Sequence, residues 1–514
     1  MSKTAKFAMW IMLGTILSKV LGFGRELVLA NFYGASDITD AFLVAVNIPN
    51  IAIATIGSAL ATTYVPLYFE IKNKHGEDRT NNFTNNILNI VIIFSIIICI
   101  LGLIFTEPLV KLFAIGFEGE KLNIAINFTK VLIFGSIFLS LAKIFSSYLQ
   151  VNDNFTIASL IGSPYNIIII ISIVLSYKIN ISILAYGTLL AMASQMLFQL
   201  PFAYKCGYRY VKSINLKDEY IKKMIYLIGP VFIGVAVNQL NIMIDRTLAS
   251  TIGSGAISTL NYANRLNDFV VSLFVLSIIT VIYPKLAKVA DLNNKDKFVD
   301  TLVSTCNSIV LLVMPITVGT ICLATPIVRL LFQRGAFDEN ATKMTSIALI
   351  LYSIGLVAIG LREILTRTFY SLSDTKTPMI NGSIAILINI LLNLIFIRIL
   401  GYAGLALATS ISTIIGVILL SKSLKKKIKY FGGDLIIKTA IKSFIASIVM
   451  GIITTTTYNL ISNLVGIGFI QNIISVGLSI IIGIISYGLI IYTMKVREIN
   501  IAINSIKNKI RKFI

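Results

Sequence analysis

Long apolar runs constrain the fold of this chain more than any other feature of its sequence. Segments such as NIVIIFSIIICILGLIF and LIIKTAIKSFIASIVMGIITTTTYNLI reach or pass the roughly 20 residues that a helix needs to cross about 30 Å of hydrocarbon. Of the 514 residues, 56% are hydrophobic and only 13% are charged, which is more apolar surface than a soluble domain can bury. The sequence therefore predicts an all-α, polytopic membrane protein.

Apolar and polar segments alternate so that fourteen membrane spans are expected. Their centres lie near residues 20, 55, 95, 135, 166, 192, 235, 270, 310, 355, 388, 412, 448 and 482. An even number of spans places both termini on one side. Every second loop is lysine-rich, for example EIKNKHGEDR and SKSLKKKIKY, whereas the loops between them, such as YGASDI and TIGSGA, lack Lys and Arg. The positive-inside rule then predicts that both termini are cytoplasmic.

The net charge of +21 is explained by these basic loops. Because there is no sizeable soluble domain to present the charge, we expect the partner to be the lipid bilayer and not a nucleic acid. The chain also lacks a Walker A sequence, a GxSxG motif and a metal-spaced His/Cys cluster. The sequence predicts a transporter rather than an enzyme, with no cofactor other than a coupling ion, and it does not indicate an oligomeric state.

An internal repeat divides the chain. Four anchors recur, pairing Gly34 with Gly253, Pro66 with Pro284, Pro108 with Pro326 and Asp153 with Asp374. Pro66 and Pro108 are 42 residues apart, and so are Pro284 and Pro326. We therefore expect two six-helix lobes, 1–212 and 213–430, followed by a helix pair and a basic tail at 431–514. Because six spans separate equivalent positions, the lobes would be parallel repeats around a central cavity that opens to either side in turn.

Charged residues inside the predicted spans are the main candidates for a binding site, since each costs about 2.5–3.5 kcal/mol at the centre of a membrane helix. Lys19 and Glu26 are seven residues apart on one face of the first span, and Arg25 adjoins them. Arg265 is a further cation within a span, and Asp40 lies near the start of the second span. Guanidinium groups pair bidentately with phosphate oxygens, so this set predicts a pocket for an anionic headgroup.

An internal ion pair is the alternative interpretation of these charges. Arg25 is able to pair with Glu26, or with Asp245, which the repeat places opposite Glu26. Such a pair would lock helices together without binding a substrate.

A second group of polar residues lies in two later spans. Asn389 and Asn393 are one helical turn apart, and Thr409 lies in the next span. With Asp245 they would form an oxygen-rich cage for a hard cation such as sodium. Asparagines in membrane helices also cross-link neighbouring helices through hydrogen bonds, which is the alternative role.

Several motifs of the chain are similar to those of a known family. SKVLGFGRELVLANFYGASDITDAFLVAVNIPN, YANRLNDF, YPKLAK and PIVRLLFQRGAFDEN resemble the MurJ (MviN) family of lipid II flippases, within the multidrug/oligosaccharidyl-lipid/polysaccharide exporter superfamily. The resemblance covers almost the whole chain. It implies a bacterial plasma-membrane flippase that moves undecaprenyl-pyrophosphate-linked peptidoglycan precursor, lipid II, from the cytoplasmic to the outer leaflet by alternating access.

The resemblance also implies roles for individual residues. Arg25 and Arg265 match family arginines in the central cavity, Lys19 stands where an arginine is usual, Glu26 stands where an aspartate is usual, and Asp40 matches the aspartate of the TDAF motif. The family's proposed sodium site maps onto Asp245, Asn389, Asn393, the backbone carbonyl of Leu405, and Thr409, with Asn393 replacing an aspartate. The final two helices would form a groove for the polyprenyl tail.

One departure from the family keeps other functions open. Many members carry an arginine pair and then a glutamate after NIPN, whereas this chain reads IAIATIGSALA at 51–61. A flippase for another lipid-linked polysaccharide is therefore the first alternative. A cation-coupled drug exporter of the same superfamily is the second, although fourteen spans argue against it. A membrane-embedded transferase using the acidic cluster FDEN near residue 340 is the third.

Overall fold

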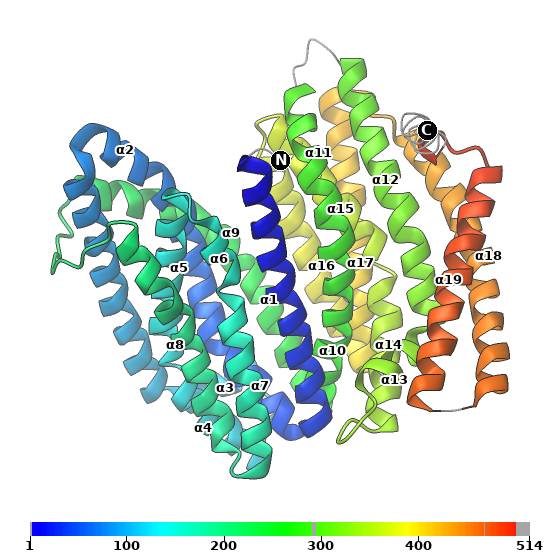
Figure 1. Ribbon diagram of the computed structural model, residues 1–514, viewed down its shortest axis with the longest axis horizontal. Helices are drawn as coiled ribbons and strands as arrows, with labels where there is room; N and C mark the ends of the chain where they lie inside the picture. Colours follow the sequence, from blue (N-terminus) through cyan, green and yellow to red (C-terminus); the bar gives the residue numbers. More distant parts are fainter. Residues whose placement is uncertain (1–2, 290–294, 467, 500–514) are drawn as a thin grey trace. The chain divides into compact units, whose positions relative to one another are not determined.

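The computed structural model describes residues 3–289, 295–466 and 468–499, and every regular element in these ranges is a helix (Figure 1). Among the described residues, nine helices are long and apolar enough to cross a membrane, or eleven if each of two bent helix pairs counts as one span. The predicted all-α membrane fold is confirmed, and the structure supports nine to eleven of the spans. The basic tail KNKIRKF lies outside the described residues.

Contacts divide the chain into two compact units, Met1–Ser258 with Arg334–Asp338 and Thr259–Gln333 with Glu339–Ile514. The helices of the first unit are α1 (Lys3–Tyr33), α2 (Asp37–Ile104), α3 (Thr106–Phe113), α4 (Gly119–Leu132), α5 (Gly135–Val151), α6 (Phe155–Leu160), α7 (Gly162–Lys178), α8 (Ser182–Lys205), α9 (Glu219–Ser250) and the start of α10 (Ala256–Val270). The second unit continues with the π-helix η1 (Val271–Val275), α11 (Leu276–Val289), α12 (Lys295–Cys322), α13 (Ala324–Phe332), α14 (Glu339–Ser353), α15 (Leu356–Ser371), α16 (Lys376–Leu400), α17 (Tyr402–Ile428), α18 (Gly433–Val465) and α19 (Phe469–Thr493).

The long helix α2 organises the first unit. Its 68 residues bend at Gly76, whose φ of 81° lies in the region that favours glycine, so α2 forms two limbs. Both limbs pack on α5, and buried aromatic side chains such as Tyr64, Phe83 and Phe145 fill the space between them. α9 also packs on α2 within this unit, and α1 packs on α7. The proposed lobe boundaries at 212 and 430 remain predictions.

Asparagine side chains on the second limb of α2 hold the segment that connects α8 to α9. Four of them bond to residues of this segment: Asn81, Asn85, Asn86 and Asn89. Asn86 donates to the carbonyl of Asn215 at 2.9 Å and accepts from its N–H at 2.8 Å. These side-chain amides therefore form hydrogen bonds with the backbone N–H and C=O groups of a segment that has no regular secondary structure, as a neighbouring β-strand would.

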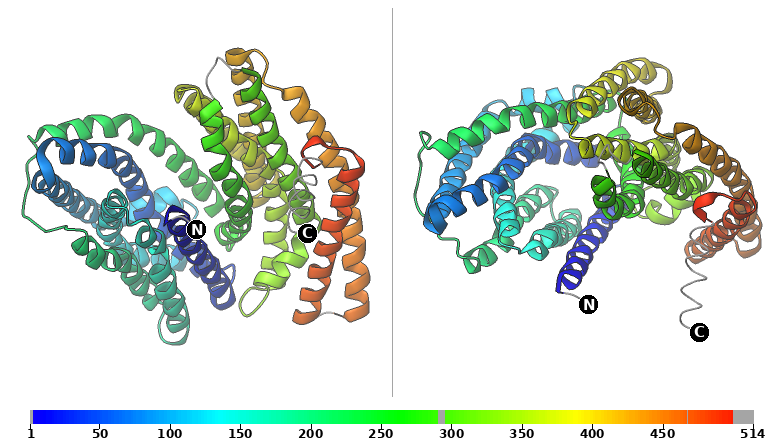
Figure 2. Two further views of the ribbon diagram at one scale, coloured as in Figure 1. Left: turned by 45° about the horizontal axis from the view of Figure 1, so that its top comes forward. Right: turned by 90° about the horizontal axis from the view of Figure 1, so that it is seen from above.

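In the second unit, α12 packs against α15 and α18, and α17 packs against α14, α15 and α16. The final helices α18 and α19 lie side by side (Figure 2). They are joined to α12 through Tyr487, whose hydroxyl donates to the carbonyl of Leu311 at 2.8 Å and lies 2.9 Å from the hydroxyl of Ser443. A hydrophobic cluster of Leu311, Ala446 and Ile491 completes this contact.

Each unit contains one bent span. The bend is 45° between α4 and α5 and 41° between α14 and α15. Each bent span ends in a left-handed residue, Asp153 (φ 59°) in the first unit and Ser373 (φ 57°) in the second. The sequence alignment pairs Asp153 with Asp374, whereas backbone conformation pairs it with Ser373, one position earlier. The alignment matched two carboxylates, but the turn is defined by its backbone torsion.

Candidate functional site

Arg25 and Glu26 form an ion pair on α1. Arg25 Nη2 lies 2.5 Å from Glu26 Oε1, and the Glu26 side chain is only 2% exposed. The Arg25 side chain is 19% exposed, and its guanidinium carbon lies 5.8 Å from the centre of the Tyr165 ring. The internal ion pair that the sequence allowed is therefore present. Because Glu26 is buried with a cation, its charge is compensated within the helix.

Lys19 lies on the same helix but in different surroundings. Its side chain is exposed, and no described residue is recorded as its partner. Nearby, a Cβ at Gly22 would lie 3.5 Å from the Asn166 side chain of α7, whereas a Cβ at Gly24 would meet nothing within 4 Å. A Cβ at Gly22 would thus make only an ordinary van der Waals contact with α7, so packing requires neither glycine, and α1 runs as one helix through both.

Asp40 is fully buried, with 0% exposure, near the start of α2. Its carboxylate accepts hydrogen bonds from Lys121 Nζ, from the Gly255 N–H and from the Ser258 N–H, each at 2.8 Å. Asp40 thus binds the first turn of α10, where unpaired backbone donors favour an anion. Any contact between Asp40 and a headgroup would require these bonds to break.

Glycines bring loop backbones together around Asp40. A Cβ on Gly34, whose φ is 59°, would clash with the carbonyl oxygen of Ala336. The Ala336 N–H donates to the carbonyl of Asn31 at 2.8 Å, and the Gly116 N–H donates to the Ser250 hydroxyl at 3.0 Å. The turns that follow α1, α3, α9 and α13 are therefore in direct backbone contact within the first unit.

The predicted cation ligands are divided between the units. In the second unit, Asn393 Nδ2 donates to Asn389 Oδ1 at 3.1 Å, and Asn389 Nδ2 lies 3.5 Å from Thr409 Oγ1. Thr409 Oγ1 donates to the carbonyl of Leu405 at 2.9 Å. These four residues thus form one connected, neutral network, while Asp245 belongs to α9 of the first unit. The described residues contain no cluster of three His, Cys, Asp or Glu side chains for a transition metal.

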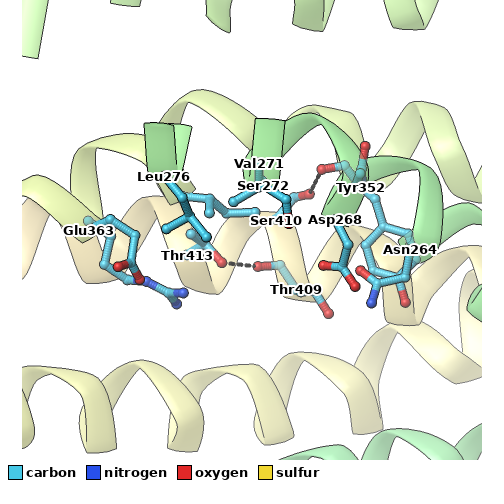
Figure 3. Close-up of a pocket in the computed structure, with 14 residues that line it drawn as sticks. Asn264, Asp268, Val271, Ser272, Leu276, Tyr352, Glu363, Thr409, Ser410 and Thr413 are labelled. Atoms are coloured by element: carbon cyan, nitrogen blue, oxygen red, sulfur yellow. Dashed lines mark hydrogen bonds between the residues drawn. The ribbon is translucent and has the colours of Figure 1, made fainter. Parts of the chain in front are cut away.

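Arg265 lies on α10, three residues before Asp268, which lines a cavity of about 350 Å³ in the second unit (Figure 3). Its Nη1 lies 3.8 Å from Asp268 Oδ2, and Asp268 lines the cavity. Thr409, one of the predicted cation ligands, lines the same cavity, as does Ser272 of η1. π-Helical turns inside α-helices are frequent at functional sites. The structure therefore brings the partner of Arg265 and one predicted cation ligand to one cavity.

Sequence reasoning missed two lysines of the first unit. Lys121, the partner of Asp40, is separated from it by 81 residues, and no short motif connects them. Lys143 lies in α5, in the predicted span SLAKIFSSYL, and is exposed. The criterion that selected Arg25, a charge inside an apolar span, would also have selected Lys143.

Comparison with known proteins identifies the family. The family model described as lipid II flippase MurJ matches residues 29–476, which is well over half of the chain. The chain belongs to the MurJ family. This confirms the family resemblance predicted from the sequence motifs, and the matched range includes Asp40 and Arg265 and begins after Arg25.

Curated MurJ relatives match over most of their length. The chain is 32% identical over 453 residues to a probable lipid II flippase MurJ of Buchnera aphidicola subsp. Baizongia pistaciae, covering 87% of this chain and 88% of that protein. It is 29% identical over 423 residues to the lipid II flippase MurJ of Burkholderia cenocepacia, covering 80% and 82%.

Solved structures agree with this assignment. A lipid II flippase MurJ in an inward closed conformation matches with a TM-score of 0.80 and 28% identity, covering 95% of this chain and 98% of that one. An inward-facing multidrug resistance MATE family transporter of the MOP superfamily matches with a TM-score of 0.67 and 16% identity, covering 82% and 98%. The second match concerns the fold alone.

Proposed function

We propose that this chain is a flippase that moves undecaprenyl-pyrophosphate-linked peptidoglycan precursor, lipid II, from the inner to the outer leaflet of the plasma membrane. The observation that carries the proposal is the match to the lipid II flippase MurJ family over residues 29–476. Arginines on α1 and α10, exposed in part, supply the charge that a pyrophosphate headgroup requires. The activity is transport and needs no covalent catalysis.

The complete topology has fourteen spans with both termini in the cytoplasm. Eleven spans are supported by length and composition when each bent pair counts as one. The remaining three correspond to α1, the first limb of α2 and α9, each long enough to cross a bilayer. The lysine-rich loops at alternate connections support this orientation. Two repeated six-helix lobes with a final helix pair are proposed from this count together with the recurring anchors of the sequence.

Arg25, Arg265 and Lys19 bind the headgroup in this proposal. Arg25 already pairs with Glu26, so a pyrophosphate would either share the guanidinium or displace the carboxylate. Guanidinium offers five donors and is able to serve both partners. Glu26 then sets the orientation of Arg25. Asp40 binds the first turn of α10, the helix that carries Arg265.

A coupling cation is proposed to reset the transporter. Asn389, Asn393, Leu405 and Thr409 would supply neutral oxygens, and Asp245 would supply the single carboxylate. Oxygen ligands of this kind suit a hard cation such as sodium. Asn389 Oδ1 accepts one hydrogen bond, from Asn393, and keeps a second lone pair for a cation, and the Leu405 carbonyl accepts a hydrogen bond from the Thr409 hydroxyl.

The test is flipping of labelled lipid II by the purified full-length chain in vesicles, with and without a sodium gradient. We expect Arg25→Ala and Arg265→Ala to lower the flipping rate at least about tenfold, since charge-assisted bonds to a phosphate are lost. Arg398→Ala, an exposed arginine at the end of α16, is the matched control and should flip normally. Wild-type protein that is folded but moves no lipid II would refute the proposal. Transport of another lipid-linked saccharide in its place would establish the alternative substrate.

A sodium-independent rate would refute the coupling step alone. Asp245→Asn is the sharper test of that step, because it removes the only predicted carboxylate ligand. We expect this variant to retain lipid II binding and to lose acceleration by the gradient. Loss of lipid II binding with unchanged sodium dependence would contradict the assignment of Asp245.

A further inference from the structure

α5 carries an exposed polar strip, Lys143 and Gln150, in the C-terminal half of a candidate membrane span. α4 and α5 form one bent span, and within Gly135–Val151 only Lys143 and Gln150 are exposed. Seven residues correspond to about two helical turns, so both side chains leave the same face. A lipid-facing helix exposes apolar side chains, as α7 does at Ile171, which is 53% exposed. An exposed charge at such a position is typical of a helix face that lines a water-filled space and not lipid.

The rest of this face is also polar. On a helical wheel the residues within about 60° of Lys143 include four serines, Ser136, Ser140, Ser146 and Ser147. All four are buried, and their hydroxyls have hydrogen-bond partners within the unit. Burial and hydrogen bonding within the unit thus explain the presence of the four serines, but they do not explain the presence of Lys143.

Lys143 lies across bare backbone of the first α2 limb. A Cβ at Gly57 would be 3.0 Å from Lys143 Cγ, so any larger side chain at position 57 would displace the lysine stem. Leu60 and Tyr64 line the same small recess. No described residue is recorded as an ionic or hydrogen-bond partner of the Lys143 ammonium, and residues 51–61 of α2 contain no charged residue.

Snorkelling does not explain this lysine. Lys143 is eight residues from Val151, where α5 ends, which is about 12 Å along the helix axis. An extended lysine side chain reaches roughly half that distance. The ammonium therefore stays at the depth of the span, and the described residues provide no compensating anion.

We propose that Lys143 is a second binding station for an anionic group of the transported headgroup, with Gln150 as a neutral hydrogen-bond partner. The proposal rests on the proposed lipid II flippase activity and adds to it a contact outside α1 and α10. The anion is a phosphate oxygen or a carboxylate, both of which a compact ammonium binds as a point charge. In lipid II the pyrophosphate and the peptide carboxylates are the two sources of such an anion.

Binding to the full-length chain in lipid nanodiscs tests the proposal. The probes are lipid II and undecaprenyl pyrophosphate without its saccharide, and the variants are Lys143→Gln and Lys143→Arg. Lys178→Gln, an exposed lysine at the end of α7, is the matched control. A thermal melt of each variant verifies that it is folded, and titration at two salt concentrations reports the ionic contribution.

We expect Lys143→Gln to weaken lipid II binding at least about tenfold, while Lys143→Arg and Lys178→Gln bind as wild type does. Equal weakening for both probes would identify the pyrophosphate as the anion, and weakening for lipid II alone would identify a carboxylate. Unchanged binding of both probes by folded Lys143→Gln would overturn the inference while leaving the flippase proposal intact. Wild-type protein that binds neither probe would overturn the flippase proposal and this inference with it.

Discussion

Asp40→Asn should destabilise the fold far more than its small change in shape suggests. The carboxylate is fully buried and accepts three hydrogen bonds of 2.8 Å, from Lys121, Gly255 and Ser258. An asparagine keeps one acceptor, but its NH2 group would face donors at the other position. Either orientation of the amide loses at least one of the three bonds, and it removes the buried negative charge that compensates Lys121, so we expect a decrease of about 3–5 kcal/mol in the free energy of unfolding.

The chain provides a matched control in Asp37. It pairs with the same Lys121 amine at 2.8 Å, but its side chain is 51% exposed. Solvent screens an exposed pair, so Asp37→Asn should cost less than about 1 kcal/mol. The double variant Asp40→Asn with Lys121→Met then separates the Asp40–Lys121 pair from the backbone bonds of Asp40.

Unfolding by SDS in mixed micelles measures these free energies, and amide hydrogen exchange locates the change. Protection should fall at Gly255 and Ser258 in Asp40→Asn and stay unchanged in Asp37→Asn. Equal stabilities for the two single variants would refute the reasoning, because burial would then make no difference. Unaltered exchange at Gly255 and Ser258 would show that the carboxylate does not hold the first turn of α10.

Three further changes test separate parts of the fold. Gly34→Ala puts a methyl group against the Ala336 carbonyl at a positive φ, and we expect a loss of about 1–3 kcal/mol in the same SDS titration. The Lys427 ammonium, with the Thr377 N–H, lowers the pKa of Asp374 to about 2. This contribution, about 1 kcal/mol after solvent screening, is present above pH 4 and lost as pH falls towards 2, so Asp374→Asn should differ from wild type only at the higher pH. Asn86→Ala should raise protease cleavage in 206–218, detected by mass spectrometry, because it releases two backbone groups.

Each of these expectations has a contrary result. Wild-type stability of Gly34→Ala would mean that the Ala336 backbone moves away at little cost. A pH-independent difference for Asp374→Asn would exclude the ion pair with Lys427 as its cause. Unchanged cleavage in Asn86→Ala, compared with Asn82→Ala on the same limb, would mean that the other amides suffice to hold the segment.

The membrane fold was largely predictable from the sequence, because span length is set by the bilayer and not by long-range contacts. The ion pair of Arg25 with Glu26 was predictable as one of two options, since neighbouring charges restrict each other's partners. The hydrogen bonds of Asp40 were not predictable from the sequence. The N–H groups of Gly255 and Ser258 are 215 and 218 residues away, and every residue except proline has a backbone N–H, so residue type does not indicate which one donates.

Conformation was also harder to predict than composition. The repeat register was set one residue off at Asp374, because the alignment compared side chains while the turn at Ser373 is defined by φ. The grouping of Asp245 with Asn389 stays a prediction, whereas the hydrogen bonds of Asn389 to Thr409 and Asn393 are contacts that the sequence did not specify. Short-range sequence patterns therefore predicted the helices, whereas contacts between distant segments determine the hydrogen-bond partners of their polar residues.

In α1, α2 and α5 of the first unit, the acids and the lysines singled out above lie in different surroundings. The acids Glu26 and Asp40 are buried, and each is compensated by a cation of the same unit. The lysines Lys19 and Lys143 are exposed, and no described partner is recorded for either. These helices thus carry two exposed lysines within their spans, an arrangement that is unfavourable until an anion binds. A pyrophosphate-linked lipid would compensate this charge, whereas a cationic drug would add to it, so the charge distribution itself favours an anionic headgroup over the drug-exporter alternative.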